Sequence, residues 1–164
     1  MKHRYLSVLI FVLLSACKNE AVAPTNENIL RAFTPGIAAP IASDLVRADG
    51  DEWIVTVASP QSVRLFEFPV TNLNASRIAY QASAKAEGVF GAAYLEMWVR
   101  FPGKGEFFSK ALDTPLQGNM DWSEYSAPFF LQKGQAPDRI RLQLTFADRG
   151  TVRLKNVRVE KTPR

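Results

Sequence analysis

The sequence predicts an all-β protein, an antiparallel β-sandwich or jelly roll of about eight strands. Short segments of alternating apolar and polar residues recur, with turn residues between them roughly every 8 to 12 residues. No segment keeps the period of an amphipathic helix over a sustained length. The chain has 164 residues, 47% of them hydrophobic, with 11 Phe and 3 Trp. That length is sufficient for one domain with a substantial core.

The expected strands span residues 41–47, 53–58, 62–70, 77–86, 94–101, 106–112 and 122–131, followed by a closing pair within 139–161. The clearest alternation lies in 77–86 and 94–101, where every second residue is apolar. In 62–70 the apolar positions change parity between Leu65 and Phe66. This strand is therefore either buried on both faces or interrupted by a β-bulge. Pro128 indicates that its strand lies at an edge or contains a bulge.

The segment from Arg139 to Lys161 is expected to form a β-hairpin with a tight turn at residues 148–150. In its second strand the alternation slips by one residue at Lys155–Asn156 and then resumes, which is the pattern of a β-bulge. In this register Phe146 lies opposite Val152, Leu144 opposite Leu154, Leu142 opposite Val157 and Ile140 opposite Val159. All of these side chains then share one buried face.

Residues 1–16 have the form of a signal peptide, with a positive start, an apolar stretch from Leu6 to Leu14 and small residues at the end. The apolar stretch is about half the roughly 20 residues that span a bilayer, so a permanent transmembrane helix is not expected. We expect residues 17–40, rich in Ala, Pro, Asn and Thr, to be a flexible tether. Residues 41–164 are then the folded domain. The alternative is that Ile29 to Phe33 forms one helical turn or docks on the domain.

Leu14-Ser15-Ala16-Cys17 resembles the lipobox of bacterial lipoproteins. The resemblance implies cleavage before Cys17, acylation of this residue with fatty acids such as palmitate, and a lipid anchor in the cell envelope. Several acyl chains on one residue give stable anchoring. Lys18, in place of Asp, indicates by the same resemblance the outer membrane rather than the inner one. The alternative is an ordinary secretory signal in which the Cys is incidental.

The ionisable residues exclude several classes of function. His3 and Cys17 are the only His and Cys, and both lie in or at the end of the expected leader. The mature domain therefore lacks the residues of a Ser-His-Asp triad, a Cys-His pair or a usual zinc site. Loss of Lys2 and Arg4 with the leader lowers the 20 basic residues to 18, against 16 acidic ones. This balance does not indicate a nucleic-acid partner.

The segment from Ala93 to Val159 resembles the galactose-binding-like jelly rolls, a group that includes many carbohydrate-binding modules. The resemblance rests on YLEMWVRFPGKGEF, on the Trp-led DWSEYSAPFF and on a closing G-x-V-x-L-x-x-V pattern at Gly150, Val152, Leu154 and Val157. It implies a fold more specifically than a ligand, because the same fold hosts protein-binding and structural modules. No ligand residue of that group is carried over.

The first candidate site is the outward face of the expected strand 94–101. Its residues are Tyr94, Glu96, Trp98 and Arg100, with Gln81 and Ser83 beside them if their strand is adjacent. Aromatic rings on a sheet face offer a large contact area for the apolar side of a sugar ring, and the charged neighbours can hydrogen-bond its hydroxyls. The alternative is that loops cover Trp98 and that its role is structural.

The second candidate site is a basic patch on the expected hairpin. The predicted register places Arg141 opposite Arg158, with Arg153 and Lys155 further along the same outer face. Anionic polysaccharide or lipopolysaccharide would suit such a patch. Like charges directly across a ladder cost stability, so neighbouring carboxylates that leave a solvated surface are the alternative.

A third group is acidic and consists of Asp44, Asp49, Asp51 and Glu52. Carboxylate oxygens are the ligands that Ca²⁺ prefers, but the spacing is not that of an EF-hand, and a solvated turn is the alternative. No other cofactor is expected. The leading hypothesis is a membrane-anchored, non-catalytic module that binds carbohydrate or another envelope ligand. A structural or assembly lipoprotein that packs on an envelope protein is the alternative. A small polysaccharide hydrolase is less favoured, because no paired-carboxylate motif is visible.

Overall fold

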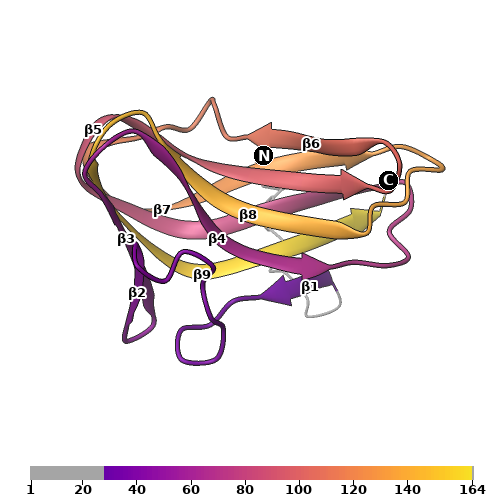
Figure 1. Cartoon of the computed structure of the whole chain (residues 1–164), viewed down its shortest axis with the longest axis horizontal. Helices are drawn as coiled ribbons and strands as arrows, with labels where there is room; N and C mark the ends of the chain where they lie inside the picture. The colour runs from indigo at the N-terminus through magenta and orange to yellow at the C-terminus, as the bar shows by residue number, and fades with distance from the viewer. Residues whose placement is uncertain (1–27, 164) are drawn as a thin grey trace, which may run out of the picture.

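The computed structural model describes residues 28–163, and its regular elements are β-strands (Figure 1). They are β1 (Ile29–Ala32), β2 (Val46–Asp49), β3 (Glu52–Val57), β4 (Gln61–Pro69), β5 (Ser76–Phe101), β6 (Gly105–Lys110), β7 (Leu116–Leu131), β8 (Arg139–Phe146) and β9 (Gly150–Pro163). The predicted leader and Cys17 lie outside this range. Within residues 28–163 there is no helix of the length and apolarity that a membrane span requires.

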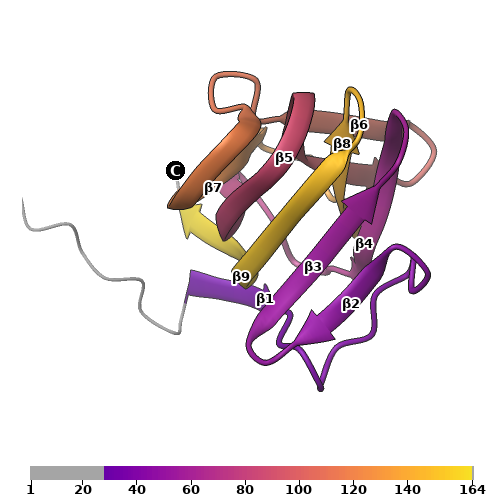
Figure 2. The ribbon, with the colours of Figure 1, turned by 90° about the vertical axis from the view of Figure 1, so that its left-hand side faces the viewer.

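The strand pairs are nested in the way that defines a jelly roll, which confirms the predicted fold class. All pairs are antiparallel: β3 pairs with β9, β4 with β8, and the two halves of β5 with β7 and β6. Successive pairs thus close inside one another, as in a hairpin rolled around a barrel. The result is a first sheet, β7-β5-β9-β3-β2 with β1 alongside β9, and a second sheet, β6-β5-β8-β4 (Figure 2).

One strand, β5, belongs to both sheets. Its early residues pair with β9 and β7, and those from Ala93 to Arg100 pair with β8. Between these parts Gly88 and Gly91 have φ of +59° and +66°, which side-chain-bearing residues rarely adopt. Figure 1 shows the bend at one end of the sandwich. Gly150 packs against it so closely that an added Cβ would lie 2.6 Å from Cα of Val89.

The predicted pairing of the closing hairpin is wrong. β8 lies between β5 and β4 in the second sheet, and β9 lies in the first sheet. Leu142 is therefore opposite Met97, and Val159 is opposite Tyr80. Residues 147–149 connect the two sheets rather than two neighbouring strands. The apolar faces were assigned correctly, because inner faces of opposite sheets line the same core.

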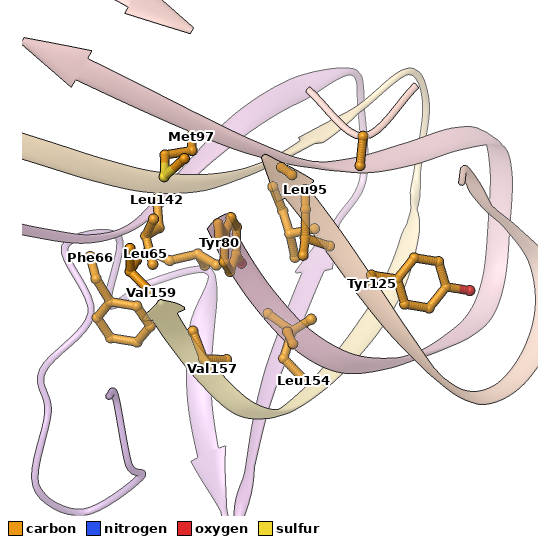
Figure 3. Close-up of a cluster of buried hydrophobic side chains, with 14 of the residues drawn as sticks. Leu65, Phe66, Tyr80, Leu95, Met97, Tyr125, Leu142, Leu154, Val157 and Val159 are labelled. Atoms are coloured by element: carbon orange, nitrogen blue, oxygen red, sulfur yellow. The ribbon is translucent and has the colours of Figure 1, made fainter. Parts of the chain in front are cut away.

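The predicted bulge in β9 is present. Asn156 has φ of +52°, and the pairing with β5 shifts between Gln81–Arg158 and Ser83–Lys155. A bulge also interrupts the pairing of β4 with β8 around Leu65, which settles the ambiguity in that strand. Residues on both sides of each bulge keep their apolar side chains in the core (Figure 3).

The flexible tether expected over residues 17–40 is wrong from Ile29 onward, because β1 pairs with β9. Phe33 follows β1 and is 7% exposed, with its ring stacked on Phe66 at a centroid distance of 4.3 Å. Trp53 donates a 2.9 Å hydrogen bond from Nε1 to the carbonyl of Phe33. Apolar burial and this hydrogen bond hold the segment on the domain, so the folded unit begins before residue 41.

Candidate functional site

Tyr94, Glu96, Trp98 and Arg100 lie on one outer face of β5, as predicted, between β6 and β8 of the second sheet. We call this surface the Trp98 face. Its centre is Glu96, whose side chain is 7% exposed. The carboxylate accepts hydrogen bonds from Trp98 Nε1 at 2.6 Å, from Gln143 Nε2 and from Thr145 Oγ1 at 3.1 Å. Lys110 Nζ lies 3.4 Å from it. Its oxygens are thus occupied by the protein itself.

Trp98 does not present an open ring face. Phe108 on β6 stacks on the indole at a centroid distance of 5.0 Å, and the guanidinium of Arg141 on β8 lies 5.3 Å from its centroid. The register places these neighbours on opposite sides of Trp98. The aromatic ring most available on this face is that of Phe108, a residue 56% exposed that the sequence analysis did not single out.

The other members of the Trp98 face are also engaged. Arg100 donates two hydrogen bonds to Asp138, at 2.9 and 2.6 Å, and this guanidinium holds the pKa of Asp138 below its usual value. Lys110 Nζ lies 4.9 Å from the ring centroid of Tyr94. Each charged or aromatic group of the Trp98 face thus contacts another group of the protein, and Phe108 lies at the edge of the face.

Gln81 and Ser83 do not flank the Trp98 face. They precede the bend of β5 and lie on the outer face of the first sheet, opposite β9. Gln81 donates to Glu160 Oε2 at 2.9 Å and accepts from Arg158 at 2.8 Å. Ser83 lies between Glu124 on β7 and Lys155 on β9.

The predicted basic patch is wrong. Arg141 lies on the second sheet, and the other three residues lie on the first, because β8 and β9 belong to different sheets. Each cation is paired with carboxylates: Arg141 with Glu106 and Glu67, Arg153 with Glu52 and Glu87, Lys155 with Glu52 and Asp51, and Arg158 with Glu160. No uncompensated basic surface is formed by these four side chains.

The acidic group does not gather around one point. Asp49 pairs with Arg47 at 3.6 Å, Asp51 and Glu52 pair with Lys155, and Asp44 lies in the turn before β2. Within residues 28–163 no three His, Cys, Asp or Glu side chains are arranged to hold a metal ion.

A cleft of about 630 Å³ lies on the first sheet, and we call it the bulge cleft. It is lined by Ile29, Ala32, Phe33, Thr34, Pro35, Asp51, Glu124, Asn156, Val157 and Arg158. A cleft of this volume is within the range of small-molecule sites. Four separate segments contribute: β1 with the residues that follow it, the turn between β2 and β3, β7 and β9.

The bulge in β9 forms one side of this cleft. Before Asn156, the outer edge of β9 pairs with β3; beyond it, the same edge pairs with β1. The backbone of Phe33 continues this pairing with a 2.9 Å hydrogen bond to the carbonyl of Val157. The change of partner leaves room above the bulge, and the left-handed conformation of Asn156 leaves its side chain exposed.

The polar groups of the bulge cleft differ in how far they are already bonded. The guanidinium of Arg158 bonds Glu160, Gln81 and the carbonyl of Asn156. Asp51 is 78% exposed and pairs with Lys155 at 3.4 Å. Glu124 is exposed and has no hydrogen-bond or ion-pair partner within residues 28–163. The carboxylate of Glu124 and the amide of Asn156 are therefore available to a ligand.

Trp122 stands beside this cleft on the same outer face of β7 as Glu124. Lys155 Nζ lies 4.8 Å from its ring centroid, reaching across β5 where the small Ser83 leaves space. Glu124, Trp122 and the residues around Phe33 were not among the candidate sites expected from the sequence. Because four separate segments line the bulge cleft, no single stretch of the sequence indicates it, apart from the predicted bulge itself.

The fold thus defines the class of protein, an antiparallel jelly-roll β-sandwich. Comparisons with known proteins do not give a more specific assignment. No protein-family model and no curated protein matches the chain. A solved structure of CBM4 is similar, with 11% identity over 71% of this chain and 75% of its own, and a TM-score of 0.49. A family 16 carbohydrate-binding module has 9% identity, 83% and 88% coverage and a TM-score of 0.48. The SGBP-B protein of a Bacteroides uniformis xyloglucan utilization locus has 14% identity, 82% and 47% coverage and a TM-score of 0.40. These similarities concern the fold alone.

Proposed function

We propose that this protein is a non-catalytic glycan-binding module whose ligand lies in the bulge cleft. The observation that carries the proposal is the combination, in one open cleft, of an apolar wall with two unengaged polar groups, Glu124 and Asn156. Pyranose rings have the matching chemistry, since each has an apolar face and a rim of hydroxyl groups. Ile29 and Pro35, which line the cleft and are partly exposed, would contact the apolar face, while the carboxylate and the amide would hydrogen-bond hydroxyls.

The test begins with a glycan array probed with the full chain in detergent, followed by calorimetric titration of the bound glycans. Glu124→Ala and Asn156→Gly should each weaken binding about tenfold, the effect of losing roughly 1.4 kcal/mol of hydrogen bonding. Glycine tolerates the backbone conformation at position 156, so the second variant removes the amide without straining the bulge. Asp113→Ala, an exposed carboxylate outside the cleft, is the matched control and should bind as wild type.

Two results would overturn this proposal in different ways. If no glycan binds, the proposed function is wrong. If a glycan binds equally well to Glu124→Ala and Asn156→Gly but loses affinity in Phe108→Ala, the ligand lies on the Trp98 face instead.

A second candidate function is glycan hydrolysis, because two carboxylates, Asp51 and Glu124, line the cleft from different segments. It is less favoured because both side chains are exposed, whereas a general acid usually needs an apolar surrounding that raises its pKa. Release of reducing ends from a bound glycan, abolished in Glu124→Gln, would establish it.

We also propose that Cys17 carries acyl chains that anchor the chain in the outer membrane. The proposal is supported by the leader-like sequence before Cys17 and by the lysine that follows it. Metabolic labelling with a palmitate analogue, followed by membrane fractionation, tests it. Wild type should be labelled and recovered with the outer membrane; equal labelling of Cys17→Ala would contradict the anchor.

A further inference from the structure

The strand β6 is an edge of the second sheet. Among residues 28–163 it pairs in a ladder only with β5. Its sequence, GEFFSK, contains no proline, and its register with β5 runs without a bulge from Phe101–Gly105 to Glu96–Lys110. Phe107 and Phe108 are 51% and 56% exposed. Natural edge strands limit further pairing by short length, charged side chains, proline, a bulge or a cover; β6 is short and carries Glu106 and Lys110, but it has neither a proline nor a bulge.

The backbone direction shows which groups face the free edge. Ala111 N donates to Leu95 O at 3.0 Å, so odd-numbered residues of β6 bond to β5. Inward and outward hydrogen-bonding positions alternate along an antiparallel strand. Glu106, Phe108 and Lys110 therefore direct their N–H groups toward the free edge. The carbonyls of Glu106 and Phe108 point the same way, while that of Lys110 accepts from Leu112.

The side chains at these same positions are complementary to themselves. If a second β6 runs antiparallel with Phe108 opposite Phe108 of the second copy, Glu106 lies opposite Lys110 of that copy and Lys110 lies opposite Glu106. Opposite charges and aromatic pairs placed directly across a ladder are stabilising. Glu106 and Lys110, two positions before and after Phe108, thus carry the charges that this register requires. Each would add this contact to the ion pair it already forms within its own chain, Glu106 with Arg141 and Lys110 with Glu96.

We propose that the protein forms a symmetric dimer in which β6 pairs with β6 of a second copy, in the register centred on Phe108. The interface is isologous, as in most homodimers. The two second sheets join into one continuous sheet, with both Trp98 faces on one side. Both first sheets, and with them both bulge clefts, then face the opposite side, an arrangement that favours bivalent binding of a polymeric or surface ligand.

Sedimentation equilibrium of the full chain in detergent tests the dimer, with Phe108→Pro as the decisive variant. Proline at position 108 removes an N–H that faces the free edge and leaves the bonds to β5 intact. We expect wild type to be dimeric and Phe108→Pro to weaken the dimer at least about tenfold, with an unchanged far-UV circular dichroism spectrum. Ile37→Lys, which removes another exposed apolar residue, is the control and should remain dimeric.

Disulfide trapping tests the register, and it does not depend on the proline variant folding. In a Cys17→Ser background, which contains no other thiol, Phe108→Cys should form a covalent dimer under mild oxidation. Glu106→Cys should not, because its counterpart lies four residues away along the partner strand, about 13 Å. A monomeric wild type, a dimer unaffected at position 108, or equal trapping of both cysteine variants would overturn the proposal. None of these results decides whether a single bulge cleft binds glycan, so the dimer and the proposed function are tested separately.

Discussion

The indole nitrogen of Trp98 donates a 2.6 Å hydrogen bond to Oε1 of Glu96, two residues earlier on the same face of β5. This bond orients the ring between Phe108 and Arg141 and uses a carboxylate that is itself buried. The ring and the carboxylate at the centre of the Trp98 face are for this reason both engaged by the protein itself.

Replacing Glu96 by Ala should lower the free energy of unfolding by about 3 kcal/mol, because Lys110 and the indole N–H lose their acceptor at a buried position. Urea denaturation followed by tryptophan fluorescence measures the change. Glu67→Ala is the control; its pairs with Arg139 and Arg141 are more exposed and should contribute about 0–1 kcal/mol. Equal losses in the two variants would contradict the role of Glu96.

Tyr80→Phe should stabilise the protein. The ring is fully buried, and within residues 28–163 its hydroxyl has no hydrogen-bond partner (Figure 3). Burial also raises the pKa of this hydroxyl. Because an unsatisfied buried hydroxyl costs about 1–3 kcal/mol, its removal should raise the free energy of unfolding by about 1 kcal/mol. In Tyr125→Phe, whose hydroxyl points away from the cluster in Figure 3, the change should be close to zero. A loss of stability in Tyr80→Phe would show that the hydroxyl has a partner.

Substitutions of Asn156 test whether the backbone at the β9 bulge is strained. The left-handed conformation costs about 1–2 kcal/mol for most residues with a Cβ, less for Asn and nothing for Gly. We therefore expect Asn156→Ala to lower the melting temperature by several degrees and Asn156→Gly to leave it nearly unchanged. Differential scanning calorimetry of both variants makes the comparison. Similar melting temperatures for the two would rule out a strained backbone at this position.

Glu52 gives the protein part of its sensitivity to acid. The hydrogen bond from Arg153, with a further contribution from Lys155, holds the pKa of Glu52 below its usual value. A carboxylate whose pKa is lower in the folded state stabilises the fold above its unfolded pKa, about 4.3, and this contribution is lost as the pH falls toward the folded pKa.

In Glu52→Gln the midpoint of urea unfolding should be lower at pH 7 and should decrease less between pH 6 and pH 3 than in wild type. Arg153→Gln should have the same effect, and the double variant should add little, since the two residues form one pair. An unchanged slope in Glu52→Gln would contradict the assignment.

The strands and their buried faces could be predicted because alternation is a local property of the chain. Every second residue of 77–86 and 94–101 was expected to lie on an apolar face, and Ile78, Tyr80, Leu95 and Met97, which occupy such positions, are all buried. β1 was not predicted as a strand, because four residues carry too little alternation to be distinguished from a loop. Its pairing with β9 and the ring contact of Phe33 with Phe66 show that it belongs to the domain. The bulge cleft could not be predicted, because its lining residues come from four separate segments.

By itself, the sequence determined the fold class, the faces that are buried, and the bulge at Asn156. Only the tertiary structure decided which strands are neighbours. The backbone groups that join two strands are the same at every residue, and the inner faces of opposite sheets are equally apolar. A connection at residues 147–149 therefore suits a hairpin and a crossing between sheets alike. Because this connection crosses between the sheets, Arg141 lies away from Arg158, and separate ion pairs form in place of a basic patch. The bulge in β9 then lies beside β1, where it forms one side of the cleft.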